Sequence, residues 1–292
     1  MIIVMQKHAA AESVEQVVAL IRSRGLHEHV SKGEERTIIG AVGDERVFHP
    51  HEIESLAQVE RAIRVLSDWR IISREAKPEN SIINVHGVAF GDEKVLNIGA
   101  HDYNDAVFTD PFYVSNSPYA EQDGLNDKEA MRTMREVIKQ GHNTQRPVIV
   151  RIRDVRQIEP ALEGEADILY LGGELMSNRA LQAEVGRLNT PVVLCKDKHH
   201  RVDEWLVAAE HIALKGNHHI ILGEAGTLSF EADHAYRLDV EAIVRARKLS
   251  HLPVLVNIER LWHNDMPQET LYKLAVAAGA NGIINTLRSQ NI

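Results

Sequence analysis

The sequence predicts an α/β protein in which a small mixed domain precedes a barrel of the TIM, or (β/α)8, type. From residue 93 onward, short apolar runs alternate with longer segments of helical periodicity. Strands that are apolar on both faces and separated by helices are typical of a buried parallel sheet. Eight such runs occur in about 200 residues, which suits a (β/α)8 barrel.

The N-terminal 68 residues follow a different order, βαββαβ, which is that of a ferredoxin-like domain. An apolar run opens the chain, and the helical pattern after it ends at Gly25. Two strand-like runs, a short helix and a final strand follow. The six elements span residues 1–5, 11–24, 26–31, 36–43, 49–56 and 59–66. Residues 69–92 then form a linker with a short hairpin, and the barrel domain spans residues 93–292.

The barrel pattern is irregular near its start. The expected strands are residues 95–100, 111–116, 147–153, 167–172, 191–196, 219–224, 253–258 and 282–287. The expected helices are Asp127–Gln140, Asn178–Arg187, Val202–Leu214, Asp239–Leu249 and Gln268–Ala278. Only residues 101–110 separate the first two strands, whereas a helical crossover generally needs a dozen or more residues. We therefore expect a barrel that lacks its first helix, with a local gap or open groove that a neighbouring subunit is able to cover.

Composition and charge indicate which partners the protein is not expected to bind and in which cellular compartment it is expected. The net charge of −9 argues against a nucleic-acid backbone or an anionic membrane as the main partner. The single cysteine excludes an intramolecular disulfide and suits a reducing cytosol. The N-terminal apolar run is too short for a signal peptide, and no later segment has the apolar length of a membrane span. We expect a cytoplasmic protein.

Candidate chemistry lies at the carboxyl ends of the barrel strands, where TIM-barrel sites are found. The stretch "CKDKHHRVDE" is placed there: Cys195 ends a strand, and Lys196, His199 and His200 follow in the loop. Adjacent histidines rarely face one ion, because the usual helical metal motif spaces them four residues apart. If they bind no metal, His199 and His200 are solvated loop histidines, and Cys195 is a small buried thiol. Strand ends also carry Asp102 and Glu224, which are either remnants of a site or structural carboxylates.

Longer stretches resemble a known family. "MIIVMQKHAA", "WRIISREAKPENSIINVHGVAFGDEKV", "ADILYLGGELMSN" and "KGNHHIILGE" closely resemble type Iβ DAHP synthases. Those enzymes make 3-deoxy-D-arabino-heptulosonate 7-phosphate from phosphoenolpyruvate and erythrose 4-phosphate, and so open the shikimate pathway. The resemblance implies a front regulatory domain that often senses an aromatic amino acid, a barrel that binds a divalent metal, and a homo-oligomer, either a dimer or a tetramer.

The metal ligands that the resemblance implies are largely replaced. The family's first barrel strand ends in Ala-Gly-Pro-Cys, and the matching run here is Gly99-Ala100-His101-Asp102. The family's metal histidine, in an Asp-Pro-Ser-His run, falls at Arg260, and its metal glutamate falls at Thr286. A fourth ligand, an aspartate in the C-terminal loop, has no counterpart before Ile292. Of the four positions, only Asp102 carries a side chain able to coordinate an ion.

The groups that grip the anionic substrates are replaced as well. The family's Lys-Pro-Arg-Thr-Ser-Pro run corresponds to residues 113–118, "YVSNSP", and the lysine of its Lys-Arg-Gly run falls at Cys195. Two arginines of the family fall at Glu174 and Ala225. Arginine and lysine supply most of the binding of a phosphorylated substrate, so glutamate at position 174 reverses the sign of that interaction.

Three interpretations follow. The first, which we favour, is a non-catalytic homologue that modulates an authentic synthase by co-assembly or binds an aromatic effector, and that needs no cofactor. The second is a repurposed enzyme whose new site is built at the barrel mouth from Asp102, Cys195, Lys196, His199, His200, Glu224 and His263. The third is a DAHP synthase that tolerates the replacements. A divalent metal (Mn, Fe or Zn) belongs to the second and third, with Asp102 and His199 as possible ligands.

The front domain keeps the family pattern better than the barrel does, which favours binding, regulation or oligomerisation. In the family the effector site forms where front domains meet across subunits. The matching positions are His29, Ser31, Gly33 and Arg36, although an ordinary exposed turn that leads into a strand explains them equally well.

Overall fold

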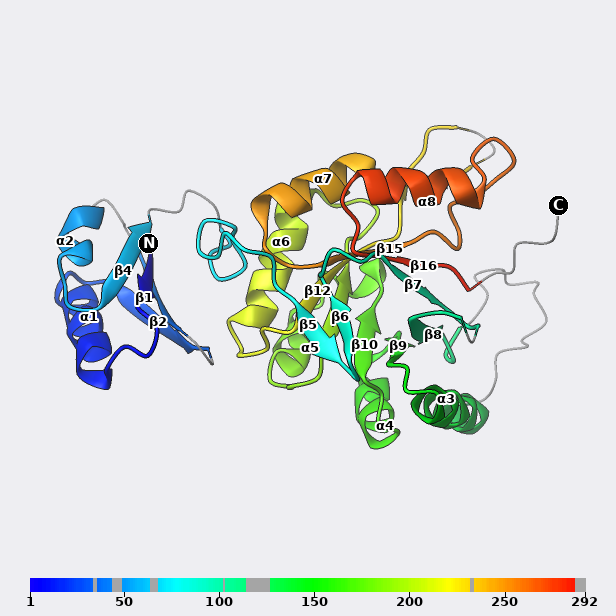
Figure 1. Ribbon diagram of the computed structural model, residues 1–292, viewed down its shortest axis with the longest axis horizontal. Coiled ribbons are helices and arrows are strands. Elements are labelled where there is room, and N and C mark those ends of the chain that lie inside the picture. Colours follow the sequence, from blue (N-terminus) through cyan, green and yellow to red (C-terminus); the bar gives the residue numbers. More distant parts are fainter. Residues whose placement is uncertain are drawn as a thin grey trace. The chain divides into compact units, whose positions relative to one another are not determined.

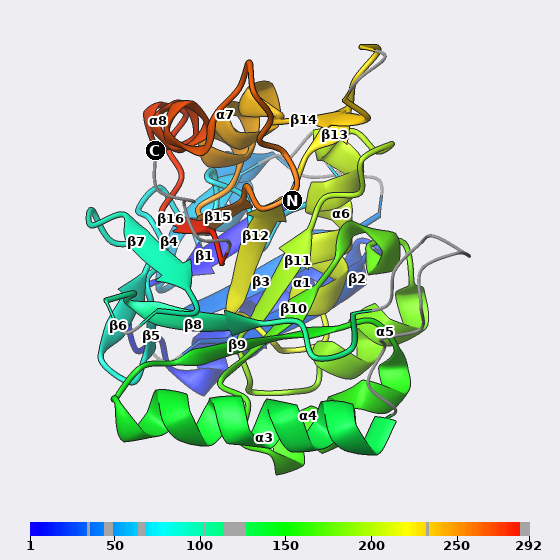
Figure 2. The same cartoon turned by 90° about the vertical axis from the view of Figure 1, so that its right-hand side faces the viewer.

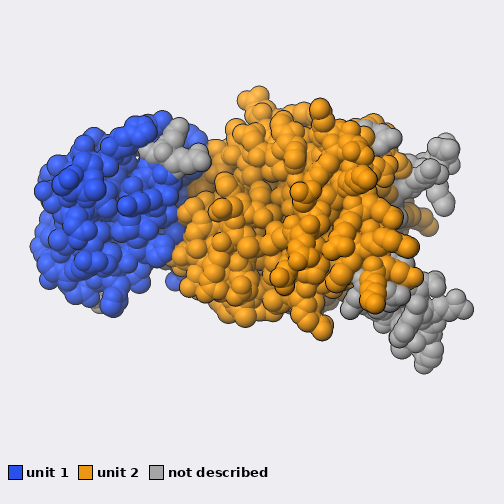
Figure 3. Space-filling model, turned by 90° about the horizontal axis from the view of Figure 1, so that it is seen from below, with its two compact units in different colours: residues 1–79 blue, residues 80–292 orange. Residues whose placement is uncertain are grey.

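The computed structural model describes residues 1–33, 36–43, 49–63, 68–101, 103–113, 127–231 and 234–286. Asp102 therefore lies outside the described residues, as do residues 114–118 of the "YVSNSP" run. The chain divides into two compact units, residues 1–79 and residues 80–292 (Figure 3). Among the described residues, no helix has both the length and the apolar character needed to cross a membrane.

The first unit is a four-stranded antiparallel sheet with two helices, and its element order is βαββαβ (Figure 1). The sheet order is β2-β3-β1-β4, so β1 lies between β3 and β4, and β2 is an edge strand. The predicted ferredoxin-like fold is confirmed. The elements are β1 Ile2–Met5, α1 Ala11–Ser23, β2 His27–Lys32, β3 Thr37–Val42, α2 Pro50–Glu54 and β4 Val59–Ile63.

One face of α1 supplies much of the core of this unit. Val14, Val17, Val18 and Ile21 recur with the 3.6-residue period of a helix, and all four are buried. They pack in one cluster with residues of β1, β3 and β4. The helix then ends because Gly25, with φ +76°, adopts the left-handed conformation that terminates helices.

The second unit is a closed barrel of eight parallel strands (Figure 2). Pairing of β16 with β7 closes it. The strands are β7 Leu96–Gly99, β8 Ala106–Thr109, β9 Val148–Ile152, β10 Ile168–Leu171, β11 Val192–Cys195, β12 Ile220–Glu224, β15 Val254–Asn257 and β16 Gly282–Ile284. The helices are α3 Asp127–Asn143, α4 Ile158–Glu163, α5 Arg179–Val185, α6 Val202–Ala213, α7 Val240–Leu249 and α8 Gln268–Ala277. Two-residue strands, β13 Thr227–Leu228 and β14 Tyr236–Arg237, pair in the loop after β12.

The first barrel helix is missing, as predicted, but the second strand lies earlier than we expected. It is β8, Ala106–Thr109, instead of residues 111–116, so the link from β7 is only residues 100–105. No described residue of this link is helical. Polar side chains replace the helix: Asn104 Oδ1 accepts the His101 amide at 2.9 Å, and the Asp105 carboxylate accepts the Asn97 amide at 2.9 Å.

A cavity of about 330 Å³ opens where the first helix is missing. Its walls come from β7, its link to β8, α8 and the end of β16, and include Asn97, His101, Tyr103, Tyr272 and Asn285. The expected groove is therefore present. A second difference from expectation is α4, a short helix between β9 and β10 that the sequence pattern did not reveal.

A β-hairpin, β5 Ile83–Val85 and β6 Val88–Phe90, lies at the amino-terminal end of the barrel. Ile83 and Phe90 join the cluster of inward-facing strand residues, among them Phe108, Tyr170 and Leu255. The two turn residues, His86 and Gly87, have φ values of +48° and +81°. Positive φ at both positions belongs to the type I′ turn, whose twist matches that of the flanking strands.

Candidate functional site

A buried ion pair lies where β11 ends. Lys196, the first residue after the strand, is 2% exposed, and its Nζ lies 3.1 Å from Asp239 Oδ2. The other oxygen of Asp239 accepts the backbone amide of Ala242 at 3.0 Å and so caps the start of α7. The cation at this strand end is therefore neutralised by a carboxylate that the fold itself holds in place.

Glu224, the last residue of β12, is fully buried beside this pair. One of its oxygens accepts the Gly226 amide at 2.5 Å, and the other has no hydrogen-bond partner among the described residues. The pKa of Glu224 is raised to about 7, mainly by burial and also by the Asp239 charge, while the Gly226 amide and Lys196 oppose the shift. A carboxyl group with this pKa is suited to hold or release a proton near neutral pH.

A second set of charges lies at the ends of β8, β9 and β10. Arg151 Nη2 lies 2.8 Å from Glu174 Oε1, and Arg153 makes a two-pronged contact with Asp110 at 3.0 and 2.5 Å. Burial alone would raise the pKa of Glu174, but Arg151 outweighs this and keeps that pKa below its usual value. Both guanidinium groups therefore already have carboxylate partners.

Cys195 and the loop histidines have separate surroundings. The Cys195 thiol is fully buried in the barrel interior next to the Tyr170 hydroxyl, and burial raises its pKa to about 12, so it is a poor nucleophile. The Nδ1 atoms of His199 and His200 lie 3.0 and 3.1 Å from the same oxygen of Asp197. These two histidines therefore bind a carboxylate of their own loop.

The residues predicted for one site at the barrel mouth together form no metal-like group among the residues that the structure describes. Lys196 and Glu224 lie together with Asp239, which the sequence did not single out. His263 stacks on His234 with ring centroids 3.3 Å apart, and the two group with Asp265 at a spacing that suits a metal. Among the described residues, neither of the groups with metal-like spacing contains Cys195, His199 or Glu224.

Comparisons with known proteins agree with this architecture. Residues 1–67 match the model of the DAHP synthase ferredoxin-like domain, and residues 113–287 match that of the DAHP synthetase I family. A phospho-2-dehydro-3-deoxyheptonate aldolase of Thermotoga maritima is 32% identical over 302 residues, which cover 97% of this chain and 88% of the relative. The chain belongs to the DAHP synthetase I family.

Solved structures support the same assignment. The crystal structure of the phospho-2-dehydro-3-deoxyheptonate aldolase (DAHP synthase) of Thermotoga maritima aligns with a TM-score of 0.67 at 31% identity, covering 97% of this chain and 86% of that one. A truncated form of 3-deoxy-D-arabino-heptulosonate 7-phosphate synthase from Thermotoga maritima has a TM-score of 0.64 at 24% identity, covering 77% and 88%. The second likeness shows the fold alone.

The positions where the DAHP synthase resemblance implies metal ligands do not fit a divalent metal. Arg260 is a cation, and its guanidinium stacks over the Tyr113 ring, 4.6 Å from the centroid. The Thr286 hydroxyl donates a close hydrogen bond to Glu259, which also accepts the Thr286 amide at 3.1 Å. Divalent transition metals in proteins bind cysteine, histidine and carboxylate side chains, so a guanidinium and a hydroxyl leave this donor set incomplete.

The predicted effector residues of the first unit lie on and just after the edge strand β2. His29 and Ser31 are two residues apart, so they face the same side of the strand. Gly33 donates its amide to the Arg36 carbonyl at 2.9 Å, and Arg36 pairs with Glu60, 2.6 Å from each carboxylate oxygen. The guanidinium expected to meet an effector is therefore held by an acidic residue of β4.

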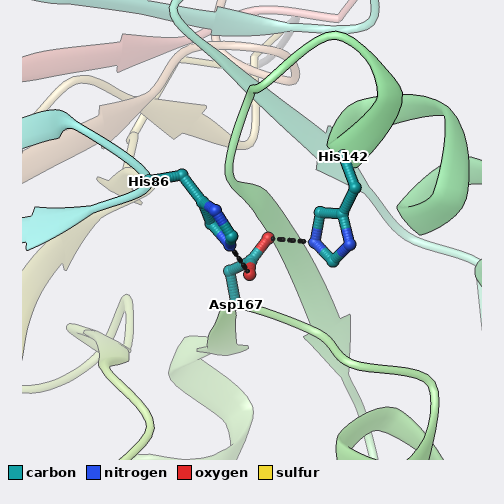
Figure 4. A group of neighbouring side chains, drawn as sticks. All are labelled: His86, His142 and Asp167. Carbon is teal, nitrogen blue, oxygen red and sulfur yellow. Dashed lines mark hydrogen bonds and ion pairs between the residues drawn. The ribbon is translucent and has the colours of Figure 1, made fainter.

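Sequence reasoning missed a group at the opposite end of the barrel. His86, His142 and Asp167 come from the β5–β6 turn, the end of α3 and the residue before β10 (Figure 4). His86 and Asp167 are 81 positions apart, and no motif spacing connects them. Only the placement of the hairpin against the barrel brings them together.

Proposed function

We propose that this DAHP synthase homologue does not condense phosphoenolpyruvate with erythrose 4-phosphate and instead acts as a regulatory or assembly partner in the shikimate pathway. The observation that carries the proposal is the pairing of cations at the barrel mouth. Lys196, Arg151 and Arg153 each contact a carboxylate of the same unit.

The energetic consequence is unfavourable for an anionic substrate. To bind phosphoenolpyruvate, Lys196 would have to leave Asp239, and Arg151 would have to leave Glu174. Breaking the buried Lys196–Asp239 pair costs about 3–5 kcal/mol when one charge is left unpaired. Breaking the Arg151–Glu174 pair costs less, because the Glu174 side chain is 48% exposed. The displaced carboxylates would also remain close to the substrate phosphate and repel it.

The metal positions add an independent reason. Arg260 and Thr286 stand where the family resemblance implies metal ligands, and both are engaged with protein neighbours. The proposed function therefore involves no metal at the mouth.

The proposed role rests on the first unit and on assembly. β2 stands at one edge of the four-stranded sheet, and a sheet edge is a place where another chain is able to add a strand. We propose a homodimer or homotetramer that also co-assembles with an authentic DAHP synthase, and an aromatic amino acid as the effector at His29, Ser31, Gly33 and Arg36.

Turnover is the first test. Pure protein is incubated with phosphoenolpyruvate, erythrose 4-phosphate and Mn²⁺, and loss of phosphoenolpyruvate is followed beside an authentic type I synthase. We expect no consumption above the no-enzyme blank. Sustained turnover that scales with protein concentration would refute the proposal.

Binding tests the regulatory part. Calorimetry with tyrosine and with phenylalanine should give saturable heat that His29→Ala weakens, while His51→Ala on the exposed surface of α2 leaves it unchanged. Co-purification with an authentic synthase from the same cell tests co-assembly. Absence of both effector and partner binding would remove the basis of this role.

Glu224 supports a second candidate, a repurposed enzyme. Its carboxyl group is buried at a strand end, with a pKa near 7 and an oxygen that lacks a partner among the described residues. A metabolite screen against the wild type and Glu224→Gln would reveal an activity that depends on this group. An activity that Glu224→Gln retains in full would exclude Glu224 as its acid or base.

A further inference from the structure

Three side chains converge at the amino-terminal end of the barrel, opposite the mouth. His86 Nε2 lies 2.7 Å from Asp167 Oδ1, and His142 Nε2 lies 2.9 Å from Asp167 Oδ2 (Figure 4). The three candidate ligand atoms lie within 4.8 Å of one another. The side chains belong to three separate segments, so whatever joins them also joins those segments.

The donor set is one that zinc and similar ions prefer. Two imidazole nitrogens and one carboxylate oxygen, with a water as the fourth ligand, are common around Zn²⁺. Asp167 is only 8% exposed in its side chain, whereas His86 is 47% and His142 is 26% exposed. The carboxylate is thus held inside while the histidine side stays open to solvent, which leaves a place for the water.

The surroundings already fix the carboxylate. The backbone amide of Val148 donates to Asp167 Oδ2 at 2.7 Å, an outer contact of the kind that orients a metal-binding carboxylate. Each imidazole presents its Nε2 to Asp167. In the metal-free protein each Nε2 carries a proton and donates it to the Asp167 carboxylate, so binding an ion through Nε2 requires the neutral ring to carry its proton on Nδ1 instead.

We propose that His86, His142 and Asp167 bind one divalent transition-metal ion of the zinc type and thereby clamp the β5–β6 hairpin to α3 and β10. Metal–nitrogen and metal–oxygen bonds are about 2 Å long, so atoms up to 4.8 Å apart must close by a small movement. His86 lies at the tip of a two-residue turn, so it is the residue best placed to make this small movement toward the ion.

The clamp is structural and not catalytic, because it lies at the end of the barrel away from the strand carboxyl ends. It secures the hairpin whose Ile83 and Phe90 fill the barrel core. It is also independent of the proposed function, since no residue of the mouth takes part in it. A catalytically active protein could carry the clamp equally well.

Titration of the metal-free full chain with Zn²⁺ tests the proposal. We expect one ion per chain by calorimetry, and the visible absorption of four-coordinate cobalt when Co²⁺ is used. A hundredfold excess of zinc over its Kd should raise the Tm by roughly 5–10 °C, while Mg²⁺ should not.

Variants locate the ion. His86→Gln and His142→Gln should each abolish the one-to-one binding and the Tm rise, whereas the exposed control His51→Gln should keep both. His263→Gln, in the second histidine group, should keep them too. Binding that survives His86→Gln and His142→Gln, binding that only His263→Gln removes, or no one-to-one binding at all would overturn the proposal and leave a hydrogen-bonded triad.

Discussion

The two ends of the barrel differ in how their polar side chains are balanced. At the mouth, opposite charges face each other within the protein, as in Lys196 with Asp239 and Arg151 with Glu174. At the amino-terminal end, two histidines converge on a single carboxylate, Asp167. At the mouth, the cations are paired with carboxylates of the same unit. At the other end, two imidazoles and a carboxylate lie close enough together to serve as ligands for a cation. A shared fold therefore does not fix where the chemistry of a family member lies.

Asp239→Asn should give the largest loss of stability because it leaves Lys196 buried without its carboxylate. Asparagine still caps α7, so the variant isolates the ion pair. We expect the free energy of unfolding to fall by about 3 kcal/mol, measured by urea denaturation. The loss should be greater at low pH, where Glu224 is protonated, because at higher pH an ionised Glu224 takes over part of the pairing. A loss under about 1 kcal/mol at pH 6 would contradict the view that this pair holds the mouth together.

Glu224→Gln tests the same end through its pH dependence. The folded pKa of about 7 lies above the ordinary glutamate value of 4.5, so between these pH values the folded state holds a proton that the unfolded state has released. Stability contributed by this proton is present at low pH and is lost as pH rises from about 4.5 to about 7. The total is about 3 kcal/mol, from 2.5 pH units at 1.36 kcal/mol each.

The glutamine variant does not titrate at this position, so it should match the wild type at pH 4 and exceed it by up to about 3 kcal/mol at pH 8. Unfolding free energies of both proteins across this range provide the measurement. All other ionisable groups are the same in both proteins and cancel in the difference. Parallel pH curves for the two would show that Glu224 is ionised in the folded state throughout.

Much of the fold was predictable because burial leaves a periodic record in the sequence. The apolar stripe of α1 and the apolar barrel strands follow from helix and strand geometry, and the missing first helix followed from chain length alone. The second strand was misplaced because Ala106–Thr109 is short and lies between two aspartates. Asp105 ends the compact turn that replaces the helix, where its carboxylate accepts the Asn97 amide. Such a turn has no hydrophobic periodicity by which to recognise it.

The candidate site was predictable only in part. The charge reversal at Glu174 is visible in the sequence, but its partner Arg151 is 23 residues earlier on the neighbouring strand, so the pairing emerges from the barrel register. Asp239 was not singled out because it stands at a helix start, where aspartate is an ordinary cap. His86 has no sequence signal at all, since a hairpin turn gives no indication of which strand end it will meet.

Variants of Asp167 measure how much the amino-terminal end of the barrel contributes to the free energy of unfolding, for comparison with the variants at the mouth. With a chelator present, Asp167→Ala should lower the free energy of unfolding by about 2 kcal/mol, because the buried Val148 amide loses its acceptor. Asp167→Asn keeps an oxygen for that amide and should cost less than half as much. Chemical denaturation of the two variants makes the comparison. Equal losses would mean that the carboxylate charge, and not the amide acceptor, matters at this end.

Glu174→Gln should give the smallest change in stability but a clear change in binding. Removing this charge frees Arg151 and lessens the repulsion of a phosphate at the mouth, so the affinity for phosphoenolpyruvate or inorganic phosphate should rise about tenfold, or 1.4 kcal/mol. Calorimetry at low ionic strength measures it, because screening would weaken the effect. Glu184→Gln, which removes an exposed carboxylate paired with Arg187, is the matched control and should bind no better than the wild type. If Glu174→Gln also leaves the affinity unchanged, the internal ion pairs are not what keeps anions out, and the contrast between the two ends of the barrel would have to rest on the shape of the mouth instead.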